Sequence, residues 1–211
     1  PGRGARVPVV APPGVASTGA PVDGTILIGG DFQGRNPLVR NASRTYIGHD
    51  ADIDVSALNS GNAGRVIVWS EEVTRFFGTV SARAPPTGHG GFVEVSSHGT
   101  LEFAGDVELA GGTPGTLLLD PRNINIGTQN NLNGELTADS DSAIFFADGG
   151  PDTNLNVSEL TAFTTGTIIL QAQDTVGDGS EGNVVFVNDV TLQSSVNLVV
   201  QAETSITLNS N

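Results

Sequence analysis

A phrase that recurs along the first half of the chain decides the fold: Gly64-Arg65-Val66-Ile67-Val68-Trp69, Gly91-Phe92-Val93-Glu94-Val95 and Gly115-Thr116-Leu117-Leu118-Leu119. The three copies start 27 and then 24 residues apart. A later phrase repeats in the same way, because Ile168–Val176 is echoed by Leu198–Ile206 at an offset of 30 residues. Short apolar runs opened by glycine predict β-strands, and self-similarity at about 20 to 30 residues is typical of a solenoid of stacked coils.

We therefore expect an all-β fold, a parallel β-helix in which each coil supplies one strand to each of two or three sheets. Inward Val, Ile, Leu and Phe side chains would stack on similar residues one coil away, at about the 4.8 Å spacing of neighbouring strands. The composition agrees, with 28 glycines for turns and 15% charged residues against about 25% in an average domain. A β-sandwich would instead show closely spaced hairpin turns and no recurring phrase.

The first 22 residues form a segment of a different kind, with five of the eleven prolines. Proline fixes φ and removes a donor, so this arm should be extended and should not lie inside a sheet. One interpretation is a flexible linker or frayed terminus. The other is a self-assembly arm in which Arg6, Val7, Val9 and Val10 dock as a strand on the exposed edge of a neighbouring molecule.

The β-helix is predicted to occupy residues 23–211, with an inserted excursion at 128–165 where the repeat is lost. Asn156 followed three residues later by Glu159 resembles a capping box. Val157, Leu160 and Phe163 follow at helical spacing. The excursion should therefore carry one helix of about two turns.

Charge and composition exclude several functions. The net charge is −14, the basic residues are all arginine, and cysteine and methionine are absent. Without cysteine there are no disulfides and no thiolate metal sites, and an acidic chain without lysine is a poor partner for nucleic acid. No apolar run approaches the roughly 20 residues of a membrane span. Because the sequence starts at Pro1 without methionine, we expect a segment of a longer polypeptide.

The charge is also unevenly distributed along the chain. Residues 1–122 hold nine arginines and twelve carboxylates and carry −3, whereas residues 123–211 hold eleven carboxylates and no arginine and carry −11. Opposite ends that differ in this way would repel each other less in a head-to-tail stack than two acidic ends.

Four phrases together resemble the cyanobacterial branch of filamentous-haemagglutinin-type exoproteins, which leave the cell by two-partner secretion. They are GTILIGGDFQG (24–34), GRVIVWSEEVTRFFG (64–78), GGFVEVSSHGTLEF (90–103) and GTLLLDPRNINIG (115–127). The resemblance implies a right-handed parallel β-helix, export through an outer-membrane transporter, and an adhesin or matrix fibre at the cell surface. Only Asn36-Pro37-Leu38 matches part of the Asn-Pro-Asn-Leu motif of the family's secretion domain, so the chain resembles a passenger segment downstream of that domain.

An enzyme is the main alternative, because right-handed β-helices include polysaccharide lyases and hydrolases. Asp50, Asp52 and Asp54 alternate along one strand face, and paired carboxylates can act as acid and base on a glycosidic bond. A solvated strand face explains the same pattern. The acidic second half offers no arginine or lysine as a cationic base.

A glycine-spaced acidic loop is the one candidate metal site. Asp174, Asp178 and Glu181 supply hard oxygen ligands suited to Ca²⁺, although their spacing matches neither an EF-hand nor a calcium-binding nonapeptide repeat. A plain acidic turn is the competing interpretation. We expect no other cofactor, and we interpret the three histidines, His49, His89 and His98, as exposed turn residues.

Asp120-Pro121-Arg122 interrupts an apolar run, and proline forces a turn there. We interpret this segment as structural and not catalytic, with Arg122 paired to a carboxylate of a neighbouring coil. The expected function is that of a non-enzymatic structural module, outside the cell or on the outer surface of a Gram-negative-type bacterium. Its partners would be copies of itself or the rest of a longer exoprotein, and surface glycans are candidate ligands. The alternative is a polysaccharide-acting or carbohydrate-binding β-helix protein that uses surface carboxylates.

Overall fold

The computed structural model describes residues 6–8, 24–128, 152–174, 177 and 179–209. Within these residues the regular structure is almost entirely β, and every strand pairing is parallel. One short α-helix and one short 3-10 helix complete it. The prediction of an all-β chain with parallel strands and one short helix is confirmed.

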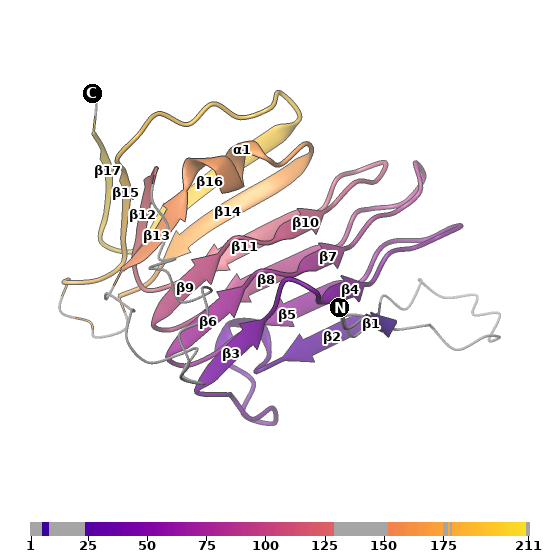
Figure 1. Ribbon diagram of the computed structural model, residues 1–211, viewed down its shortest axis with the longest axis horizontal. Helices are drawn as coiled ribbons and strands as arrows, with labels where there is room; N and C mark the ends of the chain where they lie inside the picture. The colour runs from indigo at the N-terminus through magenta and orange to yellow at the C-terminus, as the bar shows by residue number, and fades with distance from the viewer. Residues whose placement is uncertain (1–5, 9–23, 129–151, 175–176, 178, 210–211) are drawn as a thin grey trace.

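The largest sheet contains one strand from each successive pass of the chain (Figure 1). In spatial order its strands are β2 (Thr25–Ile28), β5 (Arg65–Val68), β8 (Phe92–Ser96), β11 (Thr116–Asp120), β14 (Gly166–Ala172) and β16 (Val196–Ala202). We call it the six-stranded sheet. Its strands hold the recurring phrases of the sequence.

Three further sheets contain the remaining strands. A four-stranded sheet has the order β1 (Arg6–Pro8), β4 (Asp52–Asp54), β7 (Thr79–Ser81) and β10 (Asp106–Glu108). A three-stranded sheet consists of β3 (Arg44–Ile47), β6 (Val73–Phe76) and β9 (Thr100–Phe103). The last has the order β13 (Thr153–Asn156), β12 (Ile124–Gly127), β15 (Asn183–Phe186) and β17 (Ser205–Leu208).

The registers of the six-stranded sheet follow the sequence repeat. Phe92 pairs with Arg65 on one side and with Thr116 on the other, which gives the offsets of 27 and 24 residues. Ile168 pairs with Leu198, which gives the offset of 30. The registers that the repeats predict are therefore confirmed.

The core consists of inward side chains stacked in columns across this sheet. One column runs through Ile26, Val66, Val93, Leu117, Ile168 and Leu198. A second runs through Ile28, Val68, Val95, Leu119, Leu170 and Val200. These columns join the inward residues of the other sheets in one hydrophobic cluster. Each aliphatic side chain that is fully removed from water contributes about 1.5–3 kcal/mol.

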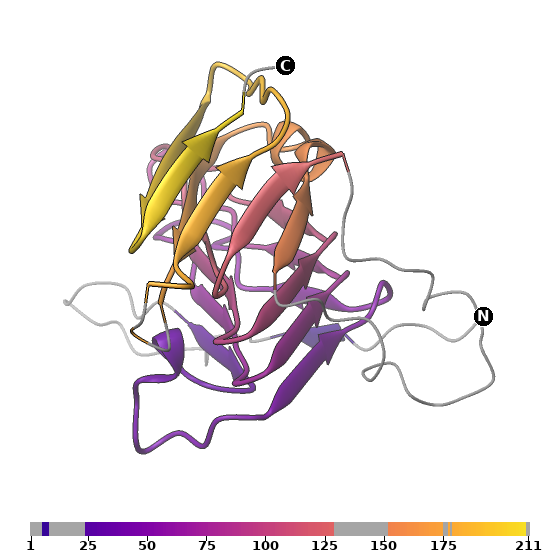
Figure 2. The same cartoon turned by 90° about the vertical axis from the view of Figure 1, so that its left-hand side faces the viewer.

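One strand departs from chain order. β13 follows β12 in the sequence but pairs with the side of β12 that faces β9, so the chain drops back one layer (Figure 2). Thr153 joins the two neighbours: its Oγ1 accepts a bond of 2.9 Å from the Leu101 N–H, and its N–H donates to the Asn123 carbonyl at 3.1 Å. The regular repeat does not predict this reversal. β13 falls within the excursion predicted at 128–165, so this part of the segment belongs to a sheet, and residues 129–151 lie outside the described part.

The helix α1 (Val157–Thr161) begins at the expected residue. The Asn156 side chain caps it by accepting a bond of 3.0 Å from the Ser158 N–H. Leu160 and Phe163 are buried against the core cluster, as their spacing predicts. The helix is shorter than the two turns expected, with five residues.

The last coil is much more open than the middle of the molecule. Ile206 and Leu208 belong to the core-facing positions of their sheet, yet they are 50% and 74% exposed. Leu198 and Val200 are only partly buried. Within the described part of the chain, no helix is long and apolar enough to cross a membrane.

Candidate functional site

The candidate site lies on the outer face of the six-stranded sheet, under the connection between β2 and β3. We call this connection, residues 29–43, the clasp. It contains the 3-10 helix η1 (Phe32–Gly34), whose first N–H is capped by the Asp31 carboxylate at 2.7 Å. The Phe32 ring packs edge-on against Phe92 with ring centroids 6.0 Å apart. The clasp is thereby held against the sheet.

Three residues of the clasp have a positive φ, namely Gly29, Gln33 and Gly34. Gly34 has a φ of +62°, and a Cβ placed there would lie 2.4 Å from the Trp69 ring. Gln33 has a φ of +52°, which is uncommon for a residue other than glycine. This backbone buries the Gln33 side chain and brings it over the sheet.

Glu94 is the most unusual residue of the site. It is fully buried on β8, and its ladder partners are two aliphatic residues, Ile67 and Leu118. Its Oε1 accepts a bond of 3.0 Å from the Gln33 backbone N–H, whereas its buried Oε2 has no hydrogen-bond partner within the described residues. Burial raises the pKa of Glu94 to about 7, so the carboxyl gains and loses its proton near neutral pH.

Asp120 is the second buried carboxylate, at the end of β11 and next to Ser96 in the ladder. Its Oδ2 accepts bonds of 2.8 Å from the Gln33 Nε2 and from the Gln173 Nε2. Burial raises the pKa of Asp120 to about 6, and the Gln33 bond opposes this rise. One clasp residue, Gln33, thus joins two carboxylates that lie 61 and 87 positions away along the chain.

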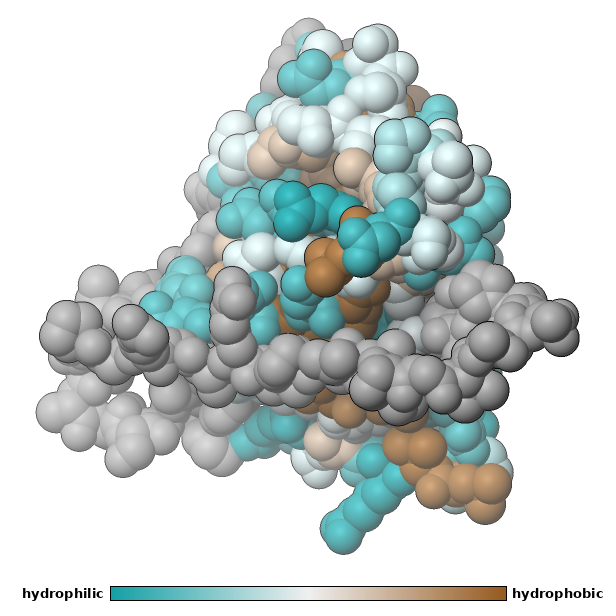
Figure 3. All heavy atoms as spheres, turned by 90° about the vertical axis from the view of Figure 1, so that its right-hand side faces the viewer, coloured by the Kyte–Doolittle hydropathy of each residue, from teal (hydrophilic) through white to brown (hydrophobic). Residues whose placement is uncertain are grey.

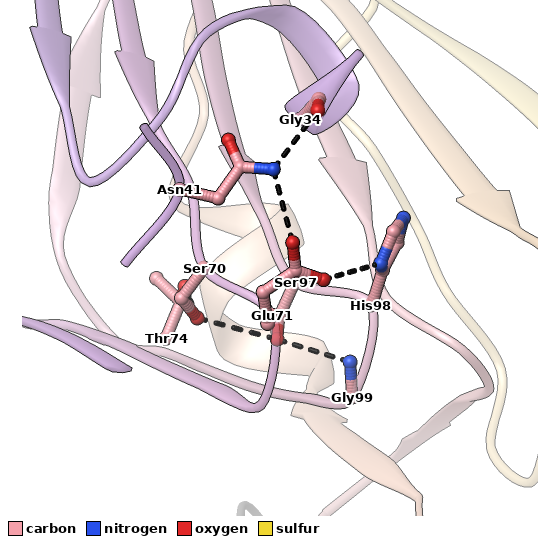
Figure 4. A network of polar contacts seen from close by, with 8 residues as sticks. All are labelled: Gly34, Asn41, Ser70, Glu71, Thr74, Ser97, His98 and Gly99. Carbon is pink, nitrogen blue, oxygen red and sulfur yellow. Dashed lines mark hydrogen bonds and ion pairs between the residues drawn. The ribbon is translucent and has the colours of Figure 1, made fainter. Parts of the chain in front are cut away.

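A series of polar contacts connects the clasp to the residues that follow β5 and β8 (Figure 4). The Asn41 Nδ2 donates to the Gly34 carbonyl at 2.9 Å and to the Glu71 carboxylate at 3.0 Å. The other oxygen of Glu71 lies 2.9 Å from the His98 Nδ1. The His98 ring in turn packs edge-on against Trp69, with centroids 4.8 Å apart.

The arrangement can bind and release protons, but the clasp covers it. The hollow beside Asp120, lined also by Gln33, Trp69 and Gln173, has a volume of about 10 Å³. That is room for about one water molecule. In this closed form the site holds a loop against the sheet, and a sugar ring cannot reach the two carboxylates.

The residues of the predicted calcium site lie in different settings. The Asp174 carboxylate accepts bonds from the N–H groups of Gly177 (2.8 Å) and Gly179 (2.6 Å), so it stabilises a turn. Glu181 is buried and forms an ion pair with Arg122 at 3.1 Å. Asp178 lies outside the described residues, and no cluster of three metal-ligating side chains occurs among those described. Calcium binding stays a prediction.

The Glu181–Arg122 pair confirms the expectation that Arg122 contacts a carboxylate of a neighbouring pass of the chain. Asp52 and Asp54 alternate with the buried Ile53 and Val55 as expected, whereas Asp50 lies in a turn before β4. His49, His89 and His98 are exposed as expected, although His89 forms an isolated parallel bridge with Thr113 and does not lie in a turn.

Of the predicted self-assembly arm, Arg6 and Val7 lie in β1, which pairs in parallel with β4 of the same chain. Arg6 is opposite Asp52, and Val7 is opposite Ile53. Val9 and Val10 lie outside the described residues. Docking on a neighbouring molecule stays a prediction.

Sequence reasoning missed Gln33, Glu94 and the role of Asp120. A signal for Glu94 was present, since the repeat places it in register with Ile67 and Leu118. A carboxylate in a column of aliphatic residues indicates a buried polar contact. Nothing in the repeat indicates that Gln33 would supply this contact.

Comparison with family models and with curated proteins finds no match to this chain.

Proposed function

We propose that the chain is a right-handed parallel β-helix that serves as a non-enzymatic structural module of an extracellular fibre or surface adhesin. One observation carries the proposal: the inward columns continue without interruption to β16 and β17, where apolar side chains are exposed. The handedness and the surface location rest on the resemblance to filamentous-haemagglutinin-type exoproteins.

The proposal requires a further coil on β16 and β17, supplied either by the same polypeptide or by a second copy. The free edge of β16 offers backbone groups for another strand, and Leu198 and Val200 offer partly covered side chains. If the next strand is β2 of a second copy, the register of the sheet places Ile26 beside Leu198 and Ile28 beside Val200. Such a head-to-tail contact propagates and does not close.

The proposed location is the outer surface or the surroundings of a Gram-negative-type bacterium, reached by two-partner secretion. The net charge of −14 supports a role without nucleic acid or anionic membrane partners. The proline-rich arm would strap the joint between neighbouring units.

Electron microscopy and sedimentation of the native material test the proposal. We expect unbranched filaments of uniform width, or long assemblies that sediment far above the mass of one chain. A monodisperse monomer that cleaves or binds polygalacturonate would overturn it.

That outcome would favour the alternative, a polysaccharide-acting or carbohydrate-binding protein. The observation behind the alternative is the pair Glu94 and Asp120, whose raised pKa values suit acid and base roles. Because the clasp covers both residues, the alternative also requires the clasp to open. Substitution of Glu94 by glutamine would abolish cleavage if the alternative is correct.

A further inference from the structure

The four-stranded sheet formed by β1, β4, β7 and β10 ends at β10, while the six-stranded sheet continues to β14 and β16. β10 pairs with β7 on one side: the Asp106 N–H donates to the Gly78 carbonyl at 3.0 Å, and the Glu108 carbonyl accepts from Ala82 at 2.9 Å. Successive residues of a strand direct their backbone groups to opposite edges. The N–H and C=O of Val107 therefore point to the other edge, where no strand pairs among the described residues.

A groove of about 460 Å³ lies beside this edge, within the range of about 300–1,000 Å³ that is common for ligand sites. Val107 and Leu109 line one side of it, and Ala162 and Phe163, which follow α1, line the other. In Figure 1, α1 lies on the side of β10 away from β7. On the face where β4, β7 and β10 end, apolar groups lie between hydrophilic ones (Figure 3).

The charged residues of the groove are mainly acidic. They are Asp106, Glu108 and Glu159, with Arg83 as the single cation among the lining residues. Arg83 is already engaged, because its Nε lies 3.3 Å from Glu108. Asp106 and Glu159 form no ion pair within the described part of the chain. Burial, and then the charge of Asp106, raise the pKa of Glu159, so this carboxylate lacks a compensating cation.

We propose that the groove beside β10 binds an extended basic peptide of a partner protein, which adds to the four-stranded sheet as a strand. The backbone of the peptide bonds to the N–H and C=O of Val107. An aliphatic side chain packs beside Val107 and Phe163, and arginine or lysine side chains next to it approach Asp106 and Glu159. Main-chain bonds to a free strand edge are a recurrent mode of peptide recognition.

The other end of the same sheet supplies a precedent. There the strand Arg6-Val7-Pro8 pairs with Asp52-Ile53-Asp54, which is an acidic, aliphatic, acidic triplet. Asp106-Val107-Glu108 repeats this triplet, whereas β7 between them reads Thr79-Val80-Ser81. Carboxylates thus lie on β4, which already pairs with the arginine-containing β1, and on β10, whose other edge has no strand among the described residues. β7 between them has none.

Nuclear magnetic resonance with synthetic peptides tests the proposal. An alternating arginine–valine pentapeptide should shift the Val107 amide signal and slow its hydrogen exchange. A glutamate–valine peptide of the same length should bind at least tenfold more weakly. An arginine–valine peptide with N-methylated backbone amides separates strand addition from simple charge attraction, and it should not protect the Val107 amide. Equal binding of the three peptides, or shifts that map away from β10 and α1, would overturn the proposal.

Variants of Asp106 and Glu159 sharpen the test. Asp106→Asn and Glu159→Gln should each weaken binding of the arginine peptide by up to about fivefold, the range of one exposed ion pair. The double variant Asp106→Lys, Glu159→Lys should reverse the preference and bind the glutamate peptide more tightly. Asp189→Asn, an exposed substitution away from the groove, is the matched control. If either groove variant unfolds, as judged by circular dichroism, the comparison of the three peptides on the unchanged chain still decides.

Discussion

β11 and β16 belong to the same sheet and present similar aliphatic side chains to the same columns, but their surroundings differ. Leu117 and Leu119 on β11 are 0% and 1% exposed, with a strand on each side. Leu198 and Val200 on β16 have a strand on one side only and stay partly exposed. Burial in this fold therefore depends on the neighbouring coils and not on the residue type alone.

The outer face of the six-stranded sheet differs in the same sense between its central strands and its edge at β16. Over β8 and β11 the clasp buries Glu94 and Asp120, while Val199 on β16 is 37% exposed. The middle of the sheet is covered on both faces, whereas β16 is only partly covered on its inner face and is exposed at Val199 on its outer face.

The largest effect is expected for a core truncation in the covered region. Leu117→Ala should lower the free energy of unfolding by about 2–5 kcal/mol, because it leaves a cavity among fully buried neighbours. The matched change Leu208→Ala, at a site 74% exposed, should stay within about 0.5 kcal/mol. Urea denaturation of both variants measures the difference, and equal losses would contradict the comparison.

The second prediction concerns pH. The pKa of Glu94 in the folded chain is about 7, above its ordinary value of 4.5, so the folded state holds this proton more tightly than the unfolded state. The contribution of this group to stability is therefore fully present below about pH 4.5 and is lost as the pH rises to about 7, by about 3 kcal/mol. Asp120, with a pKa of about 6, contributes in the same direction.

Calorimetry between pH 5 and pH 8 checks this expectation. Glu94→Gln should flatten the slope, since the amide stays neutral, and should raise the melting temperature at pH 8. Asp189→Asn, an exposed control, should keep the original slope. A stability that rises with pH across this range would contradict the buried position of Glu94.

A smaller effect is expected at the contact between the clasp and Trp69. Gly34→Ala adds a Cβ that would lie 2.4 Å from the Trp69 ring, so the clasp must move, at a cost of about 1–3 kcal/mol. The chain contains one tryptophan, and its fluorescence should shift to longer wavelength as water reaches the ring. Gly177→Ala is the control, because Gly177 also has a positive φ, +75°, but nothing within 4 Å of an added Cβ. It should lose stability without a change in fluorescence.

The smallest effect on stability is expected in the last coil. Leu208→Glu should change the free energy of unfolding by no more than about 0.5 kcal/mol. It should nevertheless reduce association of the chain, since it places a charge where the next coil would pack. Sedimentation velocity compares the variant with the unchanged chain. Equal association of the two would argue against stacking at this end.

The repeat predicts the registers of the six-stranded sheet, because the Val, Ile and Leu residues at fixed offsets are buried together only when the strands pair with the repeats aligned. Asn156 likewise predicts the start of α1, since capping is local. The reversed position of β13 and the clasp have no such signature. Gln33 meets Glu94 and Asp120 only after the sheet has formed, and a polar contact between residues so distant in sequence follows no period.

Cryo-electron microscopy of the native material tests the central claim most directly, that another coil stacks on β16 and β17. We expect a parallel strand about 4.8 Å from β16, with aliphatic side chains next to Leu198 and Val200 that belong either to the same polypeptide or to a second copy. A native structure in which β16 faces solvent, with Leu198, Ile206 and Leu208 uncovered, would contradict it.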